Sequence, residues 1–370
     1  MAQAYSIRQF QPGDEEKIVE LLKMVFYGWP QYDLPCSSLD HWKWKFMSSP
    51  LEMNTIVVAE SEGRIIGCDH GLFTKVKVGK NIVTGQQGVD SAVHPDFRGK
   101  GIYTRMDKVK TSLIRKAKTS FDYFATLNPI IIKVDLKTGA KPFPQSITKL
   151  VRIKDIDLFV KDTRINNDIK KHFLRYAVRA AKLFNNVEML GVRSVKANSR
   201  IVISNVDQFD ERVNLLWGAV KNDYFFITER SSGRLNWRYR DPRGGIYTVK
   251  QAVQDDEMLG YIVLRINSWE GRREGFIVDI LTSQDRYDCF DALISEGVRF
   301  FEEADVNVVN YCGVTGHPYV RSLKKIGFFD IRFFTINIYY NKMVDGEDFS
   351  QFEVALPDRL LFHYGDFDWI

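Results

Sequence analysis

The sequence has few cysteines and none of the spacings that give cysteine a structural role. Its four cysteines, Cys36, Cys68, Cys289 and Cys312, form neither a CxxC pair nor the pattern of a zinc site or a disulfide scaffold. We therefore expect no metal and a reducing, cytoplasmic location. No run approaches the roughly 18 apolar residues of a membrane span, and the first residues lack a signal-peptide pattern, so a soluble chain without an integral membrane segment is expected.

An excess of charge of one sign is also absent. The net charge of +5 is small for a chain of 370 residues, and the pI of about 8.8 is only mildly basic. A dedicated nucleic-acid-binding protein usually carries a concentrated basic face, so no nucleic-acid partner is expected. Apolar residues make up 45% and aromatic residues 13% of the chain, which is enough for substantial cores, and the length predicts about two domains.

The first 160 residues alternate between strand and helix patterns. We expect strands at 5–10 and 121–127, several more between 54 and 93, and helices from about residue 14 and over 102–118. The second of these helices would turn Met106, Val109 and Leu113 inward. Helices around a run of strands predict an α/β fold of the mixed α+β type.

The second half of the chain repeats the first. SSLDHWKWKF at 37–46 resembles SSGRLNWRYR at 231–240, and three further segments match in the same order. The matched residues are Trp42 with Trp237, Gly67 with Gly260, Asp90 with Asp279, and Pro129 with Pro318. Such nearly constant offsets predict a tandem duplication, with domains at 1–160 and 205–345, a basic linker helix at 161–204 and a tail at 346–370.

The linker has the pattern of a long amphipathic helix over about 166–186. Its lysines and arginines lie away from an apolar stripe that contains Ile169, Phe173, Tyr176, Ala177, Ala180 and Phe184. A basic amphipathic helix can lie on a membrane surface. It can also connect two domains with the apolar stripe packed inward and the basic face in water, and this second arrangement is our expectation.

The segment VHPDFRGKGIYTRM, residues 93–106, joins an expected strand to an expected helix. Gly99 and Gly101 would let the backbone approach an anion closely, with several N–H groups converging on it. The helix that starts near Ile102 adds its positive dipole end, and Arg98 and Lys100 add charge. Glycine in such a turn can also serve geometry alone. Neither GxGxxG nor GxxxxGK[ST] is present, which excludes the usual nucleotide motifs.

The same segment resembles motif A of the GNAT superfamily of acyl-CoA-dependent N-acyltransferases, V-x-P-x-x-[QR]-G-x-G-x-[GA]. Arg98 to Gly101 match it, whereas Tyr103 stands where a small residue is usual. The resemblance covers most of residues 5–160 and implies an N-acetyltransferase that uses acetyl-CoA or another acyl-CoA as co-substrate. It implies a cofactor site made of Ala92, Val93, Arg98, Gly99, Lys100, Gly101, Ile102, Tyr103 and Asn128.

The resemblance also implies that a small-molecule amine attacks the thioester directly. The glutamate base and the tyrosine acid that are common in the superfamily are missing, since Gln87 and Asp135 stand near their places. Asp90 is the candidate base and Tyr103 the candidate acid. Asp90 has a counterpart in the second copy and Tyr103 could simply pack, so structural roles remain open for both. Asp69, His70 and His94 are further candidates near the same strands, although His94 beside Pro95 fits a packed or solvent-facing role better.

The second copy lacks the glycine turn. It has SQDRYDCF in place of HPDFRGKGIY, so only the first copy is expected to bind CoA, and the second would form the other wall of the acceptor site. Two-copy arrangements resemble mycothiol-synthase-type acetyltransferases, Fem-type aminoacyl transferases and large aminoglycoside acetyltransferases. In the last group the terminal carboxylate serves the active site. Ile370 or Asp366 could act in this way, although a tail that only covers apolar surface is the expectation.

Two other functions fit the sequence. A catalytically silent CoA-binding or scaffold protein would explain why the usual glutamate and tyrosine are missing, but not why the glycine turn is intact. A Fem-type aminoacyl transferase would use aminoacyl-tRNA and would not need that turn. Binding of acetyl-CoA, followed by release of its free thiol, distinguishes the three.

Overall fold

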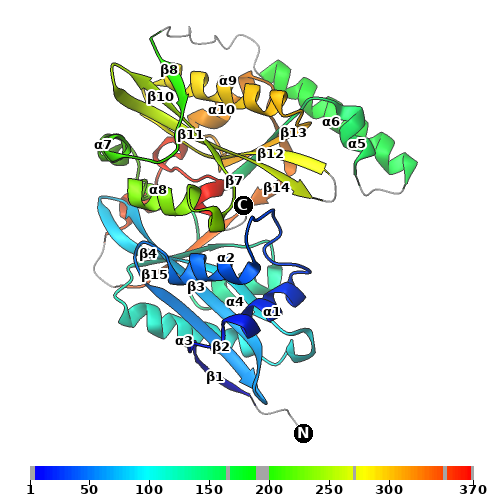
Figure 1. Cartoon of the computed structure of the whole chain (residues 1–370). Helices are drawn as coiled ribbons and strands as arrows, with labels where there is room; N and C mark the ends of the chain where they lie inside the picture. The colour runs from blue at the N-terminus through cyan, green and yellow to red at the C-terminus, as the bar shows by residue number, and fades with distance from the viewer. Residues whose placement is uncertain (1–4, 164–166, 189–199, 270–271, 345–347, 368–370) are drawn as a thin grey trace. The chain divides into compact units, whose positions relative to one another are not determined.

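The computed structural model describes residues 5–163, 167–188, 200–269, 272–344 and 348–367. The chain forms two compact units, each built on a mixed sheet flanked by helices (Figure 1). The first unit comprises Met1–Pro144, Asp241–Gly245 and Asn337–Val354, and the second comprises Gln145–Arg240, Ile246–Ile336 and Ala355–Ile370. The predicted α/β class with two mixed sheets is confirmed.

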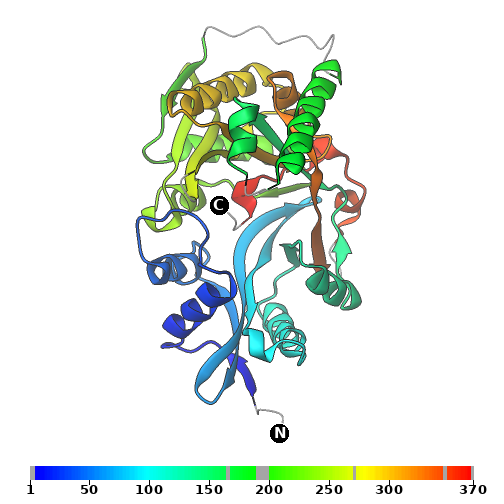
Figure 2. The same cartoon turned by 90° about the vertical axis from the view of Figure 1, so that its right-hand side faces the viewer.

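The sheet of the first unit runs in the order β1-β2-β3-β4-β5-β15-β6. Neighbouring strands are antiparallel except β4 and β5, which are parallel. Its strands are β1 (Ser6–Gln9), β2 (Asn54–Ser61), β3 (Arg64–Val78), β4 (Asn81–Val93), β5 (Phe121–Ala125), β6 (Lys141–Pro142) and β15 (Ile338–Lys342). Its helices are α1 (Glu15–Val25), α2 (Ser38–Met47), α3 (Ile102–Lys116), α4 (Pro129–Lys137) and α11 (Ser350–Glu353). Figure 2 shows α1 and α2 on one side of this sheet and α3 and α4 on the other.

The sheet of the second unit runs in the order β14-β7-β13-β12-β11-β10-β8, and its parallel pair is β12 with β13. Its strands are β7 (Ile147–Ile153), β8 (Val202–Asn205), β10 (Thr248–Gln254), β11 (Glu257–Trp269), β12 (Arg272–Thr282), β13 (Val308–Val314) and β14 (Phe329–Ile336), and a short strand, β9 (Phe226–Thr228), precedes α8. Its helices are α5 (Ile156–Lys161), α6 (Asp168–Glu188), α7 (Glu211–Val220), α8 (Ser232–Tyr239), α9 (Tyr287–Glu303) and α10 (Pro318–Lys325).

The residues matched by the predicted repeat occupy equivalent elements in the two units. Trp42 and Trp237 are in α2 and α8, Gly67 and Gly260 in β3 and β11, Asp90 and Asp279 in β4 and β12, and Pro129 and Pro318 begin α4 and α10. In each unit the strand that carries the aspartate has a register shift next to that residue. The internal repeat therefore corresponds to two copies of one fold.

Each sheet is completed by a strand from the other half of the chain. In the first unit β15 pairs with β5, from Ile338 opposite Ala125 to Lys342 opposite Phe121. In the second unit β7 lies between β13 and β14. The two units therefore differ from the linear segments 1–160 and 205–345, because residues 147–153 belong to the second unit and residues 338–342 to the first. The position beside the parallel pair is thus filled by β15 in the first sheet and by β7 in the second.

Helix α6 packs on its unit with a different face from the predicted one. Leu174 and Ala181 pack against a buried cluster that includes Val178 of α6, Val151 and Ile153 of β7, and Phe329 of β14. The predicted inward stripe is exposed, including Ile169, Phe173, Tyr176, Ala177, Ala180 and Phe184. The prediction was wrong because the helix has apolar residues on two faces, and periodicity alone does not choose between them. Within the described residues, α6 and the other helices are too short or too polar to cross a membrane.

Candidate functional site

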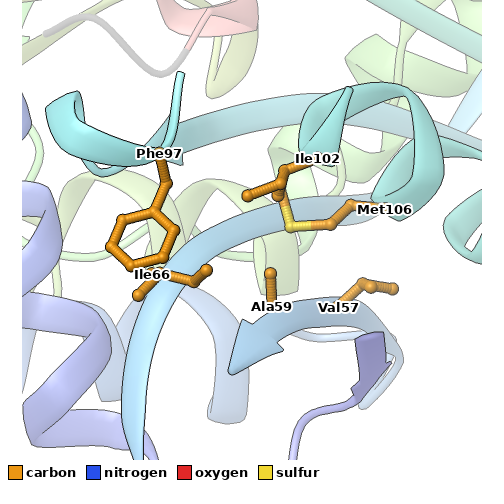
Figure 3. Close-up of a cluster of buried hydrophobic side chains, with 6 residues drawn as sticks. All are labelled: Val57, Ala59, Ile66, Phe97, Ile102 and Met106. Carbon is orange, nitrogen blue, oxygen red and sulfur yellow. The ribbon is translucent and has the colours of Figure 1, made fainter. Parts of the chain in front are cut away.

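The loop between β4 and α3 is fixed at both ends by buried side chains. Phe97 ends a short 3-10 helix over Pro95–Phe97, and Ile102 is the first residue of α3. They pack over β2 and β3 in one cluster, made up of Phe97, Ile102, Met106, Val57, Ala59 and Ile66 (Figure 3). Residues 98–101 between these anchors are exposed. The turn therefore combines an exposed backbone with fixed ends.

Both glycines of this turn have left-handed backbone angles. The φ angle is 77° at Gly99 and 72° at Gly101, where other residues pay roughly 1–2 kcal/mol. A Cβ built on either glycine would meet no atom within 4 Å, so the conformation and not the packing requires glycine. Gly101 is also the N-cap of α3, and no side chain caps that end. The first N–H groups of α3 have no acceptors within the helix, and the N-cap residue supplies none from a side chain.

Two cations accompany these N–H groups. Arg98 Nε donates to Val93 O at 3.1 Å, and Lys100 Nζ donates to Asp96 O at 3.2 Å. The first turn of α3 has no acidic residue. These features together are the ones that favour anion binding at helix N-termini.

The corresponding turn of the second unit is built differently. Arg286, with a φ of −97°, stands at the N-cap of α9, and its guanidinium Nε lies 2.9 Å from the carboxylate of Asp288 in the first helical turn. Asp285 adds a second acidic residue, and no glycine is present. This turn therefore lacks both the left-handed backbone and the excess positive charge of residues 98–101.

Strand β4 separates from β5 shortly before the loop. The two strands pair only from Gly85 opposite Phe121 to Gln87 opposite Tyr123. Residues 88–93 of β4 keep their pairing with β3, apart from a bulge at Asp90, whose φ is 48°. Among the described residues no strand pairs with the other edge of this stretch. Ala92 and Val93, two of the predicted cofactor-binding residues, lie in it.

Asp90 is held by two donors on the α1 and α2 side of the sheet. Trp29 Nε1 donates to Asp90 Oδ1 at 2.8 Å, and Lys45 Nζ lies 2.7 Å from Oδ2. The side chains of this ion pair are only 5% and 9% exposed. Each carboxylate oxygen of Asp90 thus already has a donor within the protein.

The matching aspartate of the second unit is held in the same general way. The Arg230 guanidinium lies 2.9 Å from Asp279 Oδ2, and the hydroxyls of Tyr239 and Tyr261 each donate to that oxygen at 3.1 Å. Both units therefore place a cation-paired aspartate at the bulge. Because only one unit has the glycine turn, this shared arrangement favours a structural role for Asp90 over proton removal.

His70 is locked beside Asp90. Trp42 Nε1 donates to His70 Nε2 at 3.2 Å, so His70 Nδ1 carries the proton that it shares with Asp90 O at 3.1 Å. Burial lowers the pKa of His70 to about 3. The ring therefore stays neutral and supports the bulge.

A second group of polar side chains lies on the α3 side of the same strands. Successive residues of a strand point to opposite faces, so Asp69 and Ser91 face away from His70 and Asp90. Lys110 Nζ of α3 and Ser91 Oγ donate to Asp69 Oδ1 at 2.7 and 2.6 Å. Although burial opposes its charge, Asp69 raises the pKa of Lys110. This pair anchors α3 where β4 leaves β5.

Tyr103 and Asp135 meet in this region. The Tyr103 hydroxyl donates to Asp135 Oδ1 at 3.3 Å, which joins the first turn of α3 to α4. Burial raises the pKa of Asp135 to about 7, with a contribution from Asp107. Burial and the charge of Asp69 raise the pKa of Tyr103, so the phenol keeps its proton. The two residues that depart from the superfamily pattern are therefore hydrogen-bonded to each other.

Replacing Asp135 with asparagine should flatten the pH dependence of stability. Between about pH 4 and 7 Asp135 keeps its proton in the folded protein but has released it in the unfolded chain. Its contribution to the free energy of unfolding is therefore present at low pH and is lost as the pH rises toward 7. We expect Asp135→Asn to remove up to about 1.4 kcal/mol per pH unit from this decline, as measured by urea unfolding. Asp96→Asn, at an exposed site, is the control. Equal slopes in wild type and Asp135→Asn would contradict the placement of Asp135.

The other predicted residues have defined places. Asn128 is the N-cap of α4, and its Oδ1 accepts from Ile130 N at 3.0 Å. His94 Nδ1 accepts from Asp96 N at 3.3 Å and stabilises the start of the loop. Asp366 is buried in the second unit with Arg230 NH2 2.8 Å away, which gives it a structural place in a docked tail. Ile370 lies outside the described residues.

Sequence reasoning missed the two buried lysines of this region. The residues of α3 that are buried are Ile102, Met106, Lys110 and Ile114, so the inward stripe is rotated from the predicted Met106, Val109 and Leu113, of which the last two are half-buried. The sequence signal that could have revealed Lys110 was a lysine at helical spacing with three apolar residues. Lys45 likewise stands between Trp44 and Phe46 in α2. No group of three His, Cys, Asp or Glu side chains suited to a metal ion occurs in the part of the chain that the structure describes.

Residues 6–133 match the family model described as an acetyltransferase (GNAT) domain. The matched segment runs from β1 into α4 and includes the bulge of β4 and the turn at 98–101. No curated protein matches the sequence significantly.

Several solved structures have a similar fold over nearly the whole chain. A probable N-acyltransferase from Enterococcus faecalis V583 gives a TM-score of 0.62 at 10% identity, over 95% of this chain and 73% of that one. N-myristoyltransferase of Saccharomyces cerevisiae with bound myristoyl-CoA gives 0.61 at 11%, over 92% and 79%. A tandem GNAT protein from the clavulanic acid biosynthesis pathway gives 0.57 at 14%, over 93% and 100%. The predicted tandem GNAT fold is thus confirmed.

Proposed function

We propose that this protein is an acyl-CoA-dependent N-acyltransferase with one acyl-CoA site, in its first unit. The observation that carries the proposal is the turn at 98–101, where two left-handed glycines and two cations surround the uncapped start of α3. A diphosphate fits these features, because several backbone N–H groups can converge on it. The turn at the start of α9 in the second unit lacks them, which supports a single site.

Acetyl-CoA is the proposed donor, and an amine of a small molecule is the proposed acceptor. The pantetheine arm would follow residues 88–93 of β4, where backbone groups have no strand partner on one edge, and would pass Asn128. The yeast N-myristoyltransferase of similar fold is described with myristoyl-CoA, so a longer acyl group is the second donor to test.

In the proposed reaction the neutral amine nitrogen attacks the carbonyl carbon of the thioester. The C–N bond forms, the C–S bond breaks, the amine loses a proton to water and the thiolate gains one. Tyr103 is assigned as the donor of that last proton. Its hydroxyl lies 3.3 Å from the carboxyl of Asp135, and burial raises the pKa of Asp135 to about 7, so the proton that Tyr103 gives to the thiolate can be replaced from Asp135. Asp90, the other predicted catalytic residue, is assigned to holding the bulge of β4.

Calorimetric titration with acetyl-CoA and myristoyl-CoA tests the cofactor site, and thiol release with a panel of amines tests turnover. We expect one site per chain, and Tyr103→Phe should lower kcat by about 100-fold with binding unchanged. If neither acyl-CoA binds, the proposal fails. Binding without thiol release for any amine would instead identify a silent CoA-binding protein.

We also propose a cytoplasmic location. All four cysteines are free thiols, and Cys68, Cys289 and Cys312 are buried. Free thiols persist in reducing compartments. Fractionation of cells that produce the tagged protein would test this.

A further inference from the structure

Lys110 brings a buried positive charge to the point where β4 and β5 separate. Its side chain is 7% exposed, and its Nζ donates to Asp69 Oδ1 at 2.7 Å. Gly88 is the first residue of β4 beyond the pairing with β5, which ends at Gln87. A Cβ built on Gly88 would lie 3.8 Å from Lys110 Nζ and 3.5 Å from Phe124 Cβ. Because Gly88 has no side chain, a ligand group at this point can come within contact distance of the ammonium.

Neither packing nor backbone conformation requires glycine at position 88. Both distances are ordinary van der Waals contacts, so an alanine side chain would fit. The φ angle of Gly88 is not in the left-handed region. Glycine inside a strand weakens it, and it commonly marks a close approach of a ligand or of another backbone. In the described part of the chain no strand pairs with this edge of β4 beyond Gln87, so the glycine points to a ligand.

The second unit shows that the fold does not need a charge at this place. Both helices have buried residues at four-residue spacing: Ile102, Met106, Lys110 and Ile114 in α3, and Cys289, Leu293, Gly297 and Phe301 in α9. Gly297 therefore takes the place of Lys110. A Cβ built on it would lie 3.1 Å from Ile262, which takes the place of Asp69, since each follows the matched glycine of its strand by two residues.

The place of Gly88 is apolar in the second unit as well. It is taken by Ile277, since both residues lie two positions before the matched aspartate of their strand. Replacing a buried ion pair with packed apolar residues is often neutral or stabilising. Folding alone therefore does not explain why the first unit keeps Lys110, Asp69 and Gly88 together. They occur in the unit that also has the glycine turn, which indicates a role in the chemistry of that site.

We propose that Lys110 stabilises the thiolate of CoA as it leaves the thioester, an inference that rests on the proposed acyl-CoA site. When the C–S bond breaks, its electron pair stays on sulfur. An N–H of the Lys110 ammonium, reaching past Gly88, then donates a hydrogen bond to that sulfur, and Tyr103 supplies the proton that converts the thiolate to the thiol. Lys110 keeps its own proton throughout. A fixed charge in a buried site lowers the energy of a developing anion more than it would in water.

The carboxyl groups around Lys110 oppose a thiolate less than exposed carboxylates would. Burial raises the pKa of Asp122 to about 6 and that of Asp135 to about 7, and it also raises the pKa of Asp107. These three groups therefore carry less negative charge near neutral pH than exposed aspartates do. Although burial opposes the charge of Lys110, Asp69 raises its pKa, so the ammonium stays charged.

The pKa of the thiol of bound CoA tests this role without an acceptor amine. Thiolate absorbance in the ultraviolet reports the ionisation of the thiol, and the complex with desulfo-CoA, which lacks the sulfur, is the blank. In the wild-type complex the thiol should ionise at least tenfold more readily than in free CoA, which is a pKa lowered by about 1 or more.

Two variants should remove this effect while the affinity for CoA stays within about 3-fold of wild type, because the proposed diphosphate site is untouched. Gly88→Ala places a methyl group between the sulfur and the ammonium. Lys110→Met with Asp69→Asn removes both buried charges together, so neither is left uncompensated. The matched control is Gly218→Ala in α7, where an added Cβ meets no atom within 4 Å, and its complex should titrate like wild type.

A wild-type complex in which the thiol has the pKa of free CoA would overturn this inference and leave the acyl-CoA site in place. A lowered pKa that persists in both variants would also overturn it, since the cause would then lie elsewhere. If the wild type does not bind CoA, the proposed function fails and this inference fails with it. Gly88→Ala alone decides the matter if the double variant does not fold.

Discussion

Gly101→Asp is expected to weaken acetyl-CoA binding at least 100-fold, about 2.8 kcal/mol, while the protein stays folded. The new side chain would enter open space, and aspartate tolerates a left-handed backbone better than most residues, so the cost to folding is about 1 kcal/mol. Its carboxylate would accept hydrogen bonds from the first N–H groups of α3, as aspartate does at N-caps. It would then occupy the donors that the diphosphate needs and repel the phosphates.

Gly63→Asp is the matched control for this experiment. Gly63 lies in the turn between β2 and β3 of the same unit and has a φ of 76°, and a Cβ added there would also meet no atom within 4 Å. The control therefore adds the same charge and similar strain away from the loop, and calorimetry should show wild-type binding. If Gly101→Asp bound acetyl-CoA as tightly as Gly63→Asp, residues 98–101 would not be the diphosphate site.

Removing either member of the Lys45–Asp90 pair is expected to destabilise the first unit by about 3–5 kcal/mol, because each substitution leaves an uncompensated buried charge. Lys45→Met and Asp90→Asn keep the side-chain volumes, and asparagine tolerates the left-handed φ of 48° at position 90. The double variant leaves no buried charge at this place. Its loss of stability should be at least about 2 kcal/mol smaller than the sum of the two single losses.

Urea unfolding followed by tryptophan fluorescence gives these energies, because Trp29, Trp42 and Trp44 are in the same unit. Additive losses would show that the two charges do not interact. Measuring thiol release then distinguishes a structural role of Asp90 from a catalytic one. If Asp90 only holds the bulge, the double variant should recover activity to within about 10-fold of wild type; if Asp90 removes the proton from the amine, activity should stay low although stability returns.

The sequence predicted best what depends on neighbours along the chain. Gly99 and Gly101 impose a backbone that few other residues adopt, so the turn, the helix start and the family resemblance could all be read from one segment. The repeat could also be recognised from short segments. Trp42 and Trp237 lie in equivalent helices, and Pro129 and Pro318 begin equivalent helices. Neither prediction required knowing which distant segments meet.

Contacts between distant segments were beyond such reasoning. Lys45 and Asp90 are far apart in sequence, and only the packing of α2 on the sheet shows that they neutralise each other. Tyr103 and Asp135 each looked like a departure from the family pattern until their hydrogen bond paired them. The face of α6 was misjudged for a different reason, because two apolar faces of one helix satisfy the same periodicity.

Each sheet is completed by a strand from the other half of the chain, β15 in the first unit and β7 in the second. This arrangement also limits when the protein can fold during translation. β5 is synthesised more than 200 residues before its partner β15, which begins at Ile338, so the outer edge of the nascent first sheet stays open until β15 has been made. An open strand edge invites pairing with other chains. The N-terminal half cannot finish folding as it emerges, because the first sheet reaches its native form only after residues 338–342 have been made. Newly made chains should therefore depend on holding chaperones more than two consecutive, self-contained domains of the same length would.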